Sequence, residues 1–300
     1  MPRKAVLYLD ALRLNRWPRS LAILPGYIAA KVLQDSTLPS LNECLLLLVA
    51  FLLTWLISTA NYIINEITDA PFDAHHPGKR HRPLVQNQIS WKLLMIVWFL
   101  IVGGSGLISM TLFTLPFNYS LLALLIAGIL YNVPPIRLKD IPFLDSTAES
   151  ANNPIRFLIG WFACTPSMAP FWLLISWWLF GNFLMIGKRV AEKKFLSLEE
   201  SQGYRKSLNR VGAKPLVFFM LLNGIGFLAT FSLFLWQNDL AVMLWSLPFI
   251  TGYLALFFRK SLQDRDGAEE PERLLKNPVF AFYTLFLVIF FLVIYYLRGA

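Results

Sequence analysis

The chain has 300 residues, of which 56% are hydrophobic and 15% are charged, and its mean hydropathy is +0.55. This composition excludes a water-soluble domain and indicates a polytopic membrane protein. The formal net charge of +9 does not indicate nucleic-acid binding, because the 10 Trp, 10 Tyr and 25 Phe residues suit a lipid-facing exterior. Cys44 and Cys164 lie in or near apolar stretches and indicate neither a disulfide framework nor a metal cluster.

Apolar stretches that span or nearly span a bilayer predict nine transmembrane helices, so we expect an all-α, polytopic membrane helical bundle in a single transmembrane domain over residues 1–300. The distribution of Lys and Arg supports this count, because the basic residues gather in alternate loops. The predicted spans are residues 20–34, 42–66, 91–112, 118–132, 142–163, 169–188, 214–236, 239–258 and 277–297.

The same charge distribution predicts the orientation of the chain in the membrane. Lys and Arg remain on the cytoplasmic side, which places the N-terminus in the cytoplasm and the C-terminus outside. We therefore expect a protein integral to the cytoplasmic membrane with its active site on the cytoplasmic face. The predicted cytoplasmic segments are the N-terminal arm 1–19 and the loops 67–90, 133–141, 188–213 and 259–276.

Two amides and two carboxylates recur at four-residue intervals after the second apolar stretch: Asn61, Asn65, Asp69 and Asp73. If the helix continues to Asp73, these side chains stack on one face, about 6 Å apart along the axis. Mg²⁺ takes oxygen ligands and is usually held by one or two carboxylates together with substrate phosphates. Asp69 and Asp73 are the predicted metal ligands, Asn65 and Asn61 ligate or orient, and Glu66 lies off this stripe. A solvated helix cap is the alternative.

A basic run follows the acidic residues. Lys79, Arg80 and Arg82 lie close enough in sequence to meet the phosphates of a metal-bound diphosphate, and arginine binds such oxygens in a bidentate manner. Anchoring on the cytoplasmic side of the membrane is the alternative for these residues.

A second polar segment begins at the turn formed by Pro134 and Pro135, which forbid a continuous helix. Acidic, amide and basic side chains then recur on one face of the fifth span, where they line a substrate cavity or form an internal salt bridge. Arg156 is expected to pair with Glu149 or with a phosphate. The candidate substrate-binding residues of this segment are Arg137, Lys139, Asp145, Glu149, Asn153 (or Asn152) and Arg156.

A third polar segment ends the sixth span with Gly187-Lys188-Arg189-x-x-Glu192. Lys188 and Arg189 are predicted to bind phosphate opposite the acidic motif, with Glu192 orienting one of them. The alternative is that both side chains extend to lipid headgroups.

Together these segments resemble the UbiA superfamily of intramembrane prenyltransferases, whose members have nine transmembrane helices and an Asn-Asp-x-x-Asp-x-x-x-Asp motif after the second helix. Here the motif reads Asn65-Glu66-x-x-Asp69-x-x-x-Asp73, with Glu in place of the usual Asp. The resemblance implies Mg²⁺ bound by Asn65, Asp69 and Asp73, and a polyprenyl chain in a cavity open to lipid.

The resemblance divides between two branches of the superfamily. Familiar prenyltransferases carry a second Asp-x-x-x-Asp motif after the sixth helix, where this chain has the Gly187 to Glu192 string. That string and residues 76–83 look like the polyprenyl-phosphate (decaprenyl-phosphate-like) phosphoribosyltransferase branch. Residues 131–145 look more like the prenyl-transferring branches.

The resemblance therefore implies a Mg²⁺-dependent transferase that moves 5-phosphoribose from phosphoribosyl diphosphate to a polyprenyl phosphate. The predicted catalytic residues are Asp69, Asp73, Lys188 and Arg189. Transfer of a prenyl group to an aromatic or other lipid acceptor is the alternative, and a transporter or lipid-binding protein without chemistry is less favoured. The expected partners are an isoprenoid lipid, a diphosphate-bearing donor, membrane lipids and a second copy of the chain, but no nucleic acid.

Overall fold

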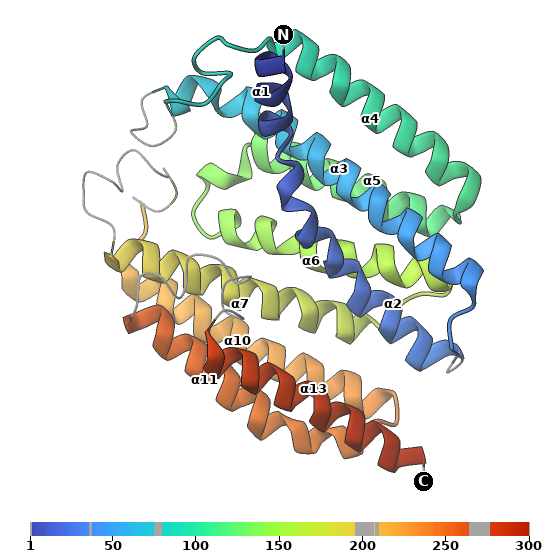
Figure 1. Ribbon diagram of the computed structural model, residues 1–300. Helices are drawn as coiled ribbons and strands as arrows, with labels where there is room; N and C mark the ends of the chain where they lie inside the picture. The colour runs from blue at the N-terminus through green and yellow to red at the C-terminus, as the bar shows by residue number, and fades with distance from the viewer. Residues whose placement is uncertain are drawn as a thin grey trace. The chain divides into compact units, whose positions relative to one another are not determined.

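The computed structural model describes residues 2–35, 38–74, 80–195, 207, 210–263 and 277–299. In these ranges every regular element is a helix, which confirms the all-α prediction (Figure 1). The chain divides into two compact units, one formed by Met1–Ile141 and Ala151–Ala169, the other by Pro142–Ser150 and Pro170–Ala300. Lys79 lies outside the described residues.

The first unit begins with four short helices, α1 (Pro2–Leu12), η1 (Leu14–Ile23), α2 (Leu24–Ala30) and η2 (Lys31–Asp35). Three long helices follow, α3 (Leu41–Asp73), α4 (Trp91–Leu112) and α5 (Leu115–Asn132), and these lie side by side (Figure 1). The 3₁₀ turn η3 (Leu138–Asp140) and most of α6 (Leu144–Cys164) complete the unit.

Helix α3 carries the predicted acidic motif and starts at a capping box. Ser40 accepts a hydrogen bond from the backbone N–H of Glu43, and the Glu43 carboxylate accepts one from the N–H of Ser40. With 33 residues the helix is about 50 Å long, more than the hydrocarbon thickness of a bilayer. Its C-terminal turns therefore carry Asn65, Asp69 and Asp73 towards one membrane surface.

Helix α3 continues through Pro71 to Asp73, so residues 67–73 of the predicted cytoplasmic segment 67–90 are helical. The last turn is held by contacts outside the helix: Arg82 pairs with Asp73, and the Arg137 guanidinium lies over the Phe72 ring. These contacts offset the backbone hydrogen bond that Pro71 removes.

Close helix packing in the first unit depends on glycine. A Cβ atom at Gly26 of α2 would overlap the backbone of Phe157 on α6, and one at Gly160 of α6 would overlap the carbonyl of Ile23. Small residues that let backbones approach are typical of membrane helix interfaces. Between α3 and α5, Gly128 leaves room for the side chain of Asn61, whose amide donates to the carbonyl of Leu124 at 2.8 Å.

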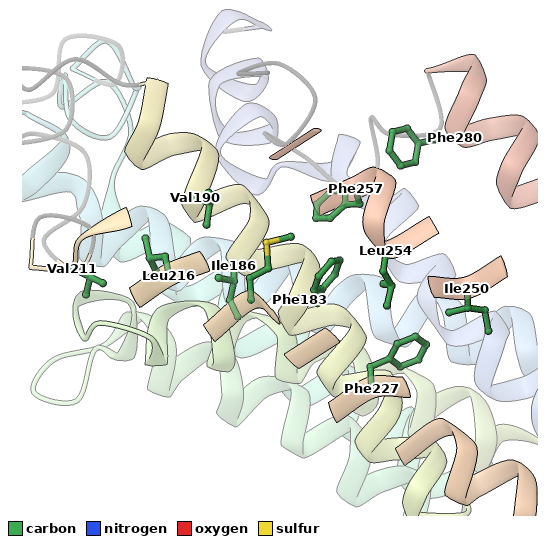
Figure 2. Close-up of a cluster of buried hydrophobic side chains, with 11 residues drawn as sticks. Phe183, Ile186, Val190, Val211, Leu216, Phe227, Ile250, Leu254, Phe257 and Phe280 are labelled. Atoms are coloured by element: carbon green, nitrogen blue, oxygen red, sulfur yellow. The ribbon is translucent and has the colours of Figure 1, made fainter. Parts of the chain in front are cut away.

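The second unit consists of α7 (Phe171–Phe195), α10 (Ala213–Gln237), η4 (Ala241–Ser246), α11 (Leu247–Gln263), α13 (Pro278–Gly299) and the first turns of α6. Aromatic and aliphatic side chains from these helices form one buried cluster (Figure 2). Its members are Phe183, Ile186, Val190, Val211, Leu216, Met220, Phe227, Ile250, Leu254, Phe257 and Phe280.

Two further loop boundaries lie later than predicted. Helix α7 continues to Phe195, so residues 188–195 are helical, and α11 continues to Gln263, so residues 259–263 are helical. In α7 the reason is packing, because Val190 belongs to the hydrophobic cluster and Arg189 is buried among carboxylates. The charged residues on which the prediction of a loop rests are therefore partly buried.

Six helices within the described ranges are long and apolar enough to cross a membrane, and residues 278–294 form a shorter apolar helix. The chain is a polytopic membrane protein. Helix α6 is less apolar than these six, since it carries Asp145, Glu149 and Arg156. The count of nine transmembrane helices and the assignment of one domain to residues 1–300 stay predictions.

Candidate active site

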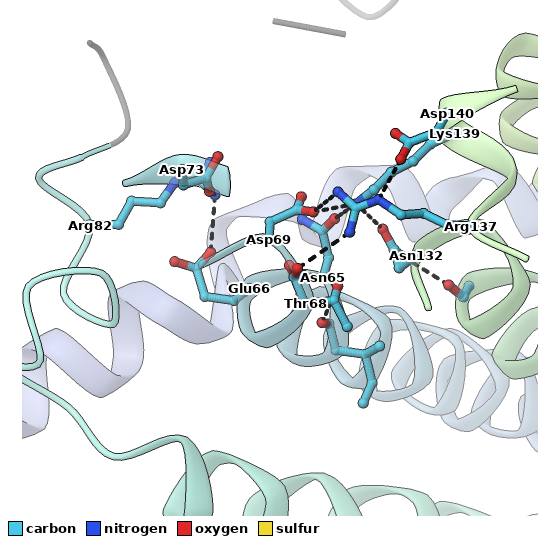
Figure 3. Close-up of polar contacts among 12 residues, drawn as sticks. Asn65, Glu66, Thr68, Asp69, Asp73, Arg82, Asn132, Arg137, Lys139 and Asp140 are labelled. Atoms are coloured by element: carbon cyan, nitrogen blue, oxygen red, sulfur yellow. Dashed lines mark hydrogen bonds and ion pairs between the residues drawn. The ribbon is translucent and has the colours of Figure 1, made fainter. Parts of the chain in front are cut away.

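The predicted acidic motif and the loop before α6 form a polar site within the first unit (Figure 3). The Lys139 ammonium donates to Asn65 Oδ1 at 3.0 Å and to Asp69 Oδ1 at 2.6 Å. It also donates to Asn132 Oδ1 at 2.9 Å. Two residues predicted from the sequence to bind metal thus converge with a predicted substrate-binding lysine and with Asn132, to which the sequence assigned no role.

The chain direction after α5 places Lys139 in this site. Val133, Pro134 and Pro135 end the helix, since proline lacks the N–H that the next turn requires and restricts the residue before it. Arg137 then adopts a left-handed backbone conformation with φ of 34°, which turns the chain into η3.

Arg137 fixes this loop on α3. Its guanidinium donates to Asp69 Oδ1 at 2.8 Å, to the Thr68 carbonyl at 3.3 Å and to Asp140 Oδ2 at 3.0 Å. The same group lies 4.2 Å from the centre of the Phe72 ring, a cation–π contact. Arg137 is therefore held from several sides, and Asp69 accepts from two cations at once.

Asp73 belongs to a second network on the same helix. Its Oδ2 accepts from Arg82 at 2.6 Å, and Arg82 also lies 3.4 Å from Glu66 Oε2. Glu66 is 3% exposed and accepts from Arg13 at 2.6 Å. Glu66 thus lies off the predicted metal stripe, as expected, and links the N-terminal segment to α3.

The sequence alone does not indicate that Arg13 belongs to this network or that Glu66 is its partner. Arg13 lies at the break between α1 and η1, with a left-handed φ of 51°. Helix α1 packs on α3 through Ala11 and Ile63, which brings the arginine to Glu66. The only local signal is an acidic residue in an apolar helix, which needs a partner when it is buried.

The electrostatics of the site are dominated by burial. Burial lowers the pKa of Lys139 to about 8, and the Asp69 carboxylate opposes this effect by favouring the charged ammonium. The carboxylates and amides of the site present hard oxygen atoms, the ligand type that Mg²⁺ prefers.

The side chains of the site provide some of the ligands that a divalent cation requires. Asn65 Oδ1 and Asp69 Oδ1 both face one point where a cationic group already lies, the Lys139 ammonium. The Asp73 carboxylate is directed to Arg82 instead. Within the described ranges no three His, Cys, Asp or Glu side chains gather as a metal-binding group, so the pocket on α3 depends on amide oxygens as well as on Asp69.

A separate charged cluster lies within the second unit. Arg189 is 1% exposed and donates to Asp145 at 3.0 Å, Glu149 at 2.7 Å and Glu192 at 2.9 Å. Ser207 donates to the same Asp145 oxygen at 3.1 Å. The predicted partnership of Glu192 with a basic residue is present.

The other candidate residues have these positions. Glu149 forms an ion pair with Arg189, and Arg156 donates to Ser58 on α3 at 3.4 Å. Arg80 is exposed and donates to His81 at 3.2 Å. Asn61 lies in the contact between α3 and α5. Asn153 is half-buried on α6 and Lys188 half-buried on α7.

Carboxylates, amides and basic side chains thus gather at the end of one long helix in a membrane protein whose described elements are all helical. A family model described as the UbiA prenyltransferase family matches residues 22–277. The chain belongs to this family, which confirms the predicted resemblance and the assignment as a transferase.

Two groups of named relatives are similar to the chain. The decaprenyl-phosphate phosphoribosyltransferase of Mycolicibacterium smegmatis is 29% identical over 238 residues, which cover 78% of this chain and 71% of the relative. The 4-hydroxybenzoate octaprenyltransferase of Vibrio cholerae is 30% identical over 125 residues, 41% of this chain and 43% of the relative.

The fold is also similar to that of a solved structure. A UbiA homologue from Archaeoglobus fulgidus, bound to GPP and Mg²⁺, has a TM-score of 0.68 at 18% sequence identity. The match covers 96% of this chain and 99% of the homologue. The fold is therefore UbiA-like along nearly the whole chain.

Proposed function

We propose that this protein is a Mg²⁺-dependent enzyme that transfers 5-phosphoribose from phosphoribosyl diphosphate to a polyprenyl phosphate. The observation that carries the proposal is the convergence of Asn65 and Asp69 oxygens with the basic side chains of Arg137 and Lys139 on one helix end. The phosphoribosyltransferase relative, which matches 78% of this chain, supports the choice of substrates.

Each residue has a role in this reaction. Asn65, Asp69 and Asp73 would hold the metal, with Asp73 released from Arg82, and the bound metal would supply positive charge to the leaving diphosphate. Arg80, Arg82, Arg137 and Lys139 donate to the diphosphate oxygens. Arg82, Arg137 and Lys139 already lie beside the carboxylates in the structure, so little reorganisation is needed when charge develops on the departing group.

The chemistry is a substitution at C1 of the ribose. The bond between C1 and the diphosphate oxygen breaks, and its electron pair leaves with the diphosphate. An oxygen of the lipid phosphate forms the new bond to C1, which carries oxocarbenium character in the transition state. The fixed cations lower the barrier by stabilising the negative charge that moves onto the leaving group.

The proposal also includes Lys188 and Arg189 as donor contacts, on the resemblance of the Gly187 to Glu192 string to the phosphoribosyltransferase branch. Arg189 already donates to three carboxylates. A donor phosphate in contact with Arg189 would therefore share the guanidinium with these carboxylates.

We further propose that the site faces the cytoplasm, from the alternation of basic loops along the sequence. A single cysteine in place of His81, in a chain whose Cys44 and Cys164 have been replaced, tests this orientation by labelling with a membrane-impermeant maleimide. Labelling only from inside-out vesicles supports it, and labelling only from intact cells contradicts it.

Prenyl transfer to an aromatic acceptor is the second candidate. It is favoured by the octaprenyltransferase relative, which is 30% identical over 125 residues. In that reaction an allylic carbon–oxygen bond breaks and the same cations stabilise the departing diphosphate.

One experiment separates the two candidates. Purified protein with Mg²⁺ is incubated with labelled phosphoribosyl diphosphate and polyprenyl phosphate, and in parallel with a prenyl diphosphate and 4-hydroxybenzoate. Lipid-soluble label in the first reaction supports phosphoribosyl transfer. Prenylated aromatic product in the second reaction alone assigns the chain to the prenyl-transferring branch.

A further inference from the structure

The Lys139 ammonium is enclosed by three side-chain oxygen atoms that come from two helices. Asn65 and Asp69 lie one turn apart on α3, and Asn132 is the last residue of α5 (Figure 3). The three contacts are 2.6 to 3.0 Å long. Carboxylate and amide oxygens of this kind are also ligands that Mg²⁺ and Ca²⁺ take in proteins.

The orientation of Asn132 is set by its other hydrogen bond. The residue is 6% exposed, and its Nδ2 group donates to the Gly128 carbonyl one turn earlier at 2.8 Å. Because the amide nitrogen is used there, the amide oxygen faces Lys139. Asn132 therefore presents an acceptor to the pocket.

Lys139 and Arg137 hold their loop in different ways. Arg137 contacts a backbone carbonyl, a neighbouring carboxylate and an aromatic ring in addition to Asp69. The hydrogen bonds of Lys139 run to the side-chain oxygens of the pocket. Its long, flexible stem lets the ammonium leave without moving the loop, which Arg137 keeps in place.

We propose that Asn132 completes a three-oxygen cation pocket with Asn65 and Asp69, and that the Lys139 ammonium occupies this pocket until a divalent cation displaces it. A metal ion and an ammonium repel each other at such distances inside a protein, so both cannot share the oxygens. The displaced ammonium then pairs with the donor diphosphate. The inference rests on the metal dependence of the proposed function, but not on the identity of the group transferred.

Two consequences follow for metal binding. Without diphosphate, the metal competes with Lys139 and binds weakly. With diphosphate, the ammonium gains a new partner, so metal and diphosphate favour each other's binding, and this coupling is reciprocal.

The test measures Mn²⁺ binding to the purified full chain by the loss of the free-ion EPR signal, with and without methylene diphosphonate as a non-reacting diphosphate. Lys139→Met, which keeps the stem and removes the charge, is expected to tighten Mn²⁺ binding without diphosphonate by at least about 3-fold and to reduce the gain that diphosphonate gives. Lys92→Met, at an exposed lysine, is the matched control and is expected to change neither.

Asn132→Ala is expected to weaken Mn²⁺ binding about 10-fold, as loss of a metal-supporting group typically does. Asn132→Asp, which keeps the oxygen and adds charge, is expected to restore it. The matched control is Asn238→Ala, because Asn238 also ends a helix and donates to the carbonyl one turn earlier, Phe234, at 2.8 Å. This control removes the same helix-end hydrogen bond outside the pocket.

Two results overturn the inference. One is equal or weaker Mn²⁺ binding by Lys139→Met in the absence of diphosphonate, and the other is equal Mn²⁺ binding by Asn132→Ala and Asn238→Ala. The proposed function fails separately, when phosphoribosyl diphosphate and polyprenyl phosphate give no product with the wild-type chain and Mg²⁺.

Discussion

Two charged regions of this protein combine carboxylates and basic side chains in different proportions. At the end of α3, the carboxylates of Glu66, Asp69, Asp73 and Asp140 meet an equal number of basic side chains, Arg13, Arg82, Arg137 and Lys139. Around α7, a single guanidinium meets three carboxylates.

Exposure separates the two regions further. Arg82 and Lys139 are 25% and 12% exposed, whereas Arg189 is 1% exposed. A partly exposed ion pair can exchange a carboxylate for a phosphate at little cost, but a buried guanidinium cannot lose a partner without leaving an uncompensated charge. The α3 region is therefore suited to ligand exchange. The Arg189 region is suited to holding helices together, which places the predicted phosphate contact of Arg189 in competition with its structural partners.

The largest expected effect is on turnover, at the α3 region. Asp69→Asn and Asp73→Asn are each expected to lower kcat by on the order of 10³-fold, since each removes a charge that balances metal and basic side chains at the leaving group. EDTA is expected to abolish turnover, and added Mg²⁺ to restore it. Product formation and thermal unfolding are measured together. Wild-type rates in both variants, or in metal-free buffer, are incompatible with the metal assignment.

The next effect is on stability, at the Arg189 region. Arg189→Ala leaves Asp145, Glu149 and Glu192 facing one another, so we expect the free energy of unfolding to fall by about 3–5 kcal/mol. Arg189→Lys is expected to be destabilising too, because an ammonium does not reproduce the planar fork. Unfolding in detergent micelles measures the change. If the Arg189→Ala protein is as stable as the wild type and only its KM for the donor is raised, Arg189 is a substrate contact and not a structural residue.

A smaller effect tests the comparison inside the α3 region. Arg13 and Arg82 both contact Glu66, but only Arg82 also holds Asp73. We expect Arg13→Ala to lower stability by about 1–3 kcal/mol, because a buried carboxylate loses a partner, with little change in the KM of folded protein. Arg82→Ala is expected to raise the KM for the donor as well. Equal KM values for the donor in the two variants show that Arg82, like Arg13, has a structural role only.

The sequence predicts the features of this comparison that depend on local spacing. The four-residue repeat from Asn61 to Asp73 needs only helix geometry, and the family resemblance rests on three polar segments and the predicted spans. Helix α3 and the convergence of Asn65 with Asp69 follow from these patterns.

The partners of these residues depend on contacts distant in sequence. Lys139 reaches Asn65 across a separation of 74 residues, and Arg13 reaches Glu66 across 53. Such pairs follow from packing of whole helices, which periodicity does not specify. For the same reason, residues 188–195 are predicted from the sequence to belong to a cytoplasmic loop, although packing extends α7 through them.

The smallest expected effect is at Lys188, the neighbour of Arg189. Lys188 is half-buried on α7, and a single partly exposed charge contributes roughly 0.2–1 kcal/mol to a contact. Lys188→Ala is therefore expected to raise the KM for phosphoribosyl diphosphate by about 2- to 5-fold, with any share of the contact made only in the transition state appearing also in kcat.

The comparison uses phosphoribosyl diphosphate and a prenyl diphosphate as alternative donors. A change confined to phosphoribosyl diphosphate ties the α7 end to donor choice, because the charge then discriminates between two donors that have the same diphosphate leaving group. Unchanged kinetics with both donors assign Lys188 to the membrane surface, where its stem covers apolar area and its ammonium meets lipid headgroups.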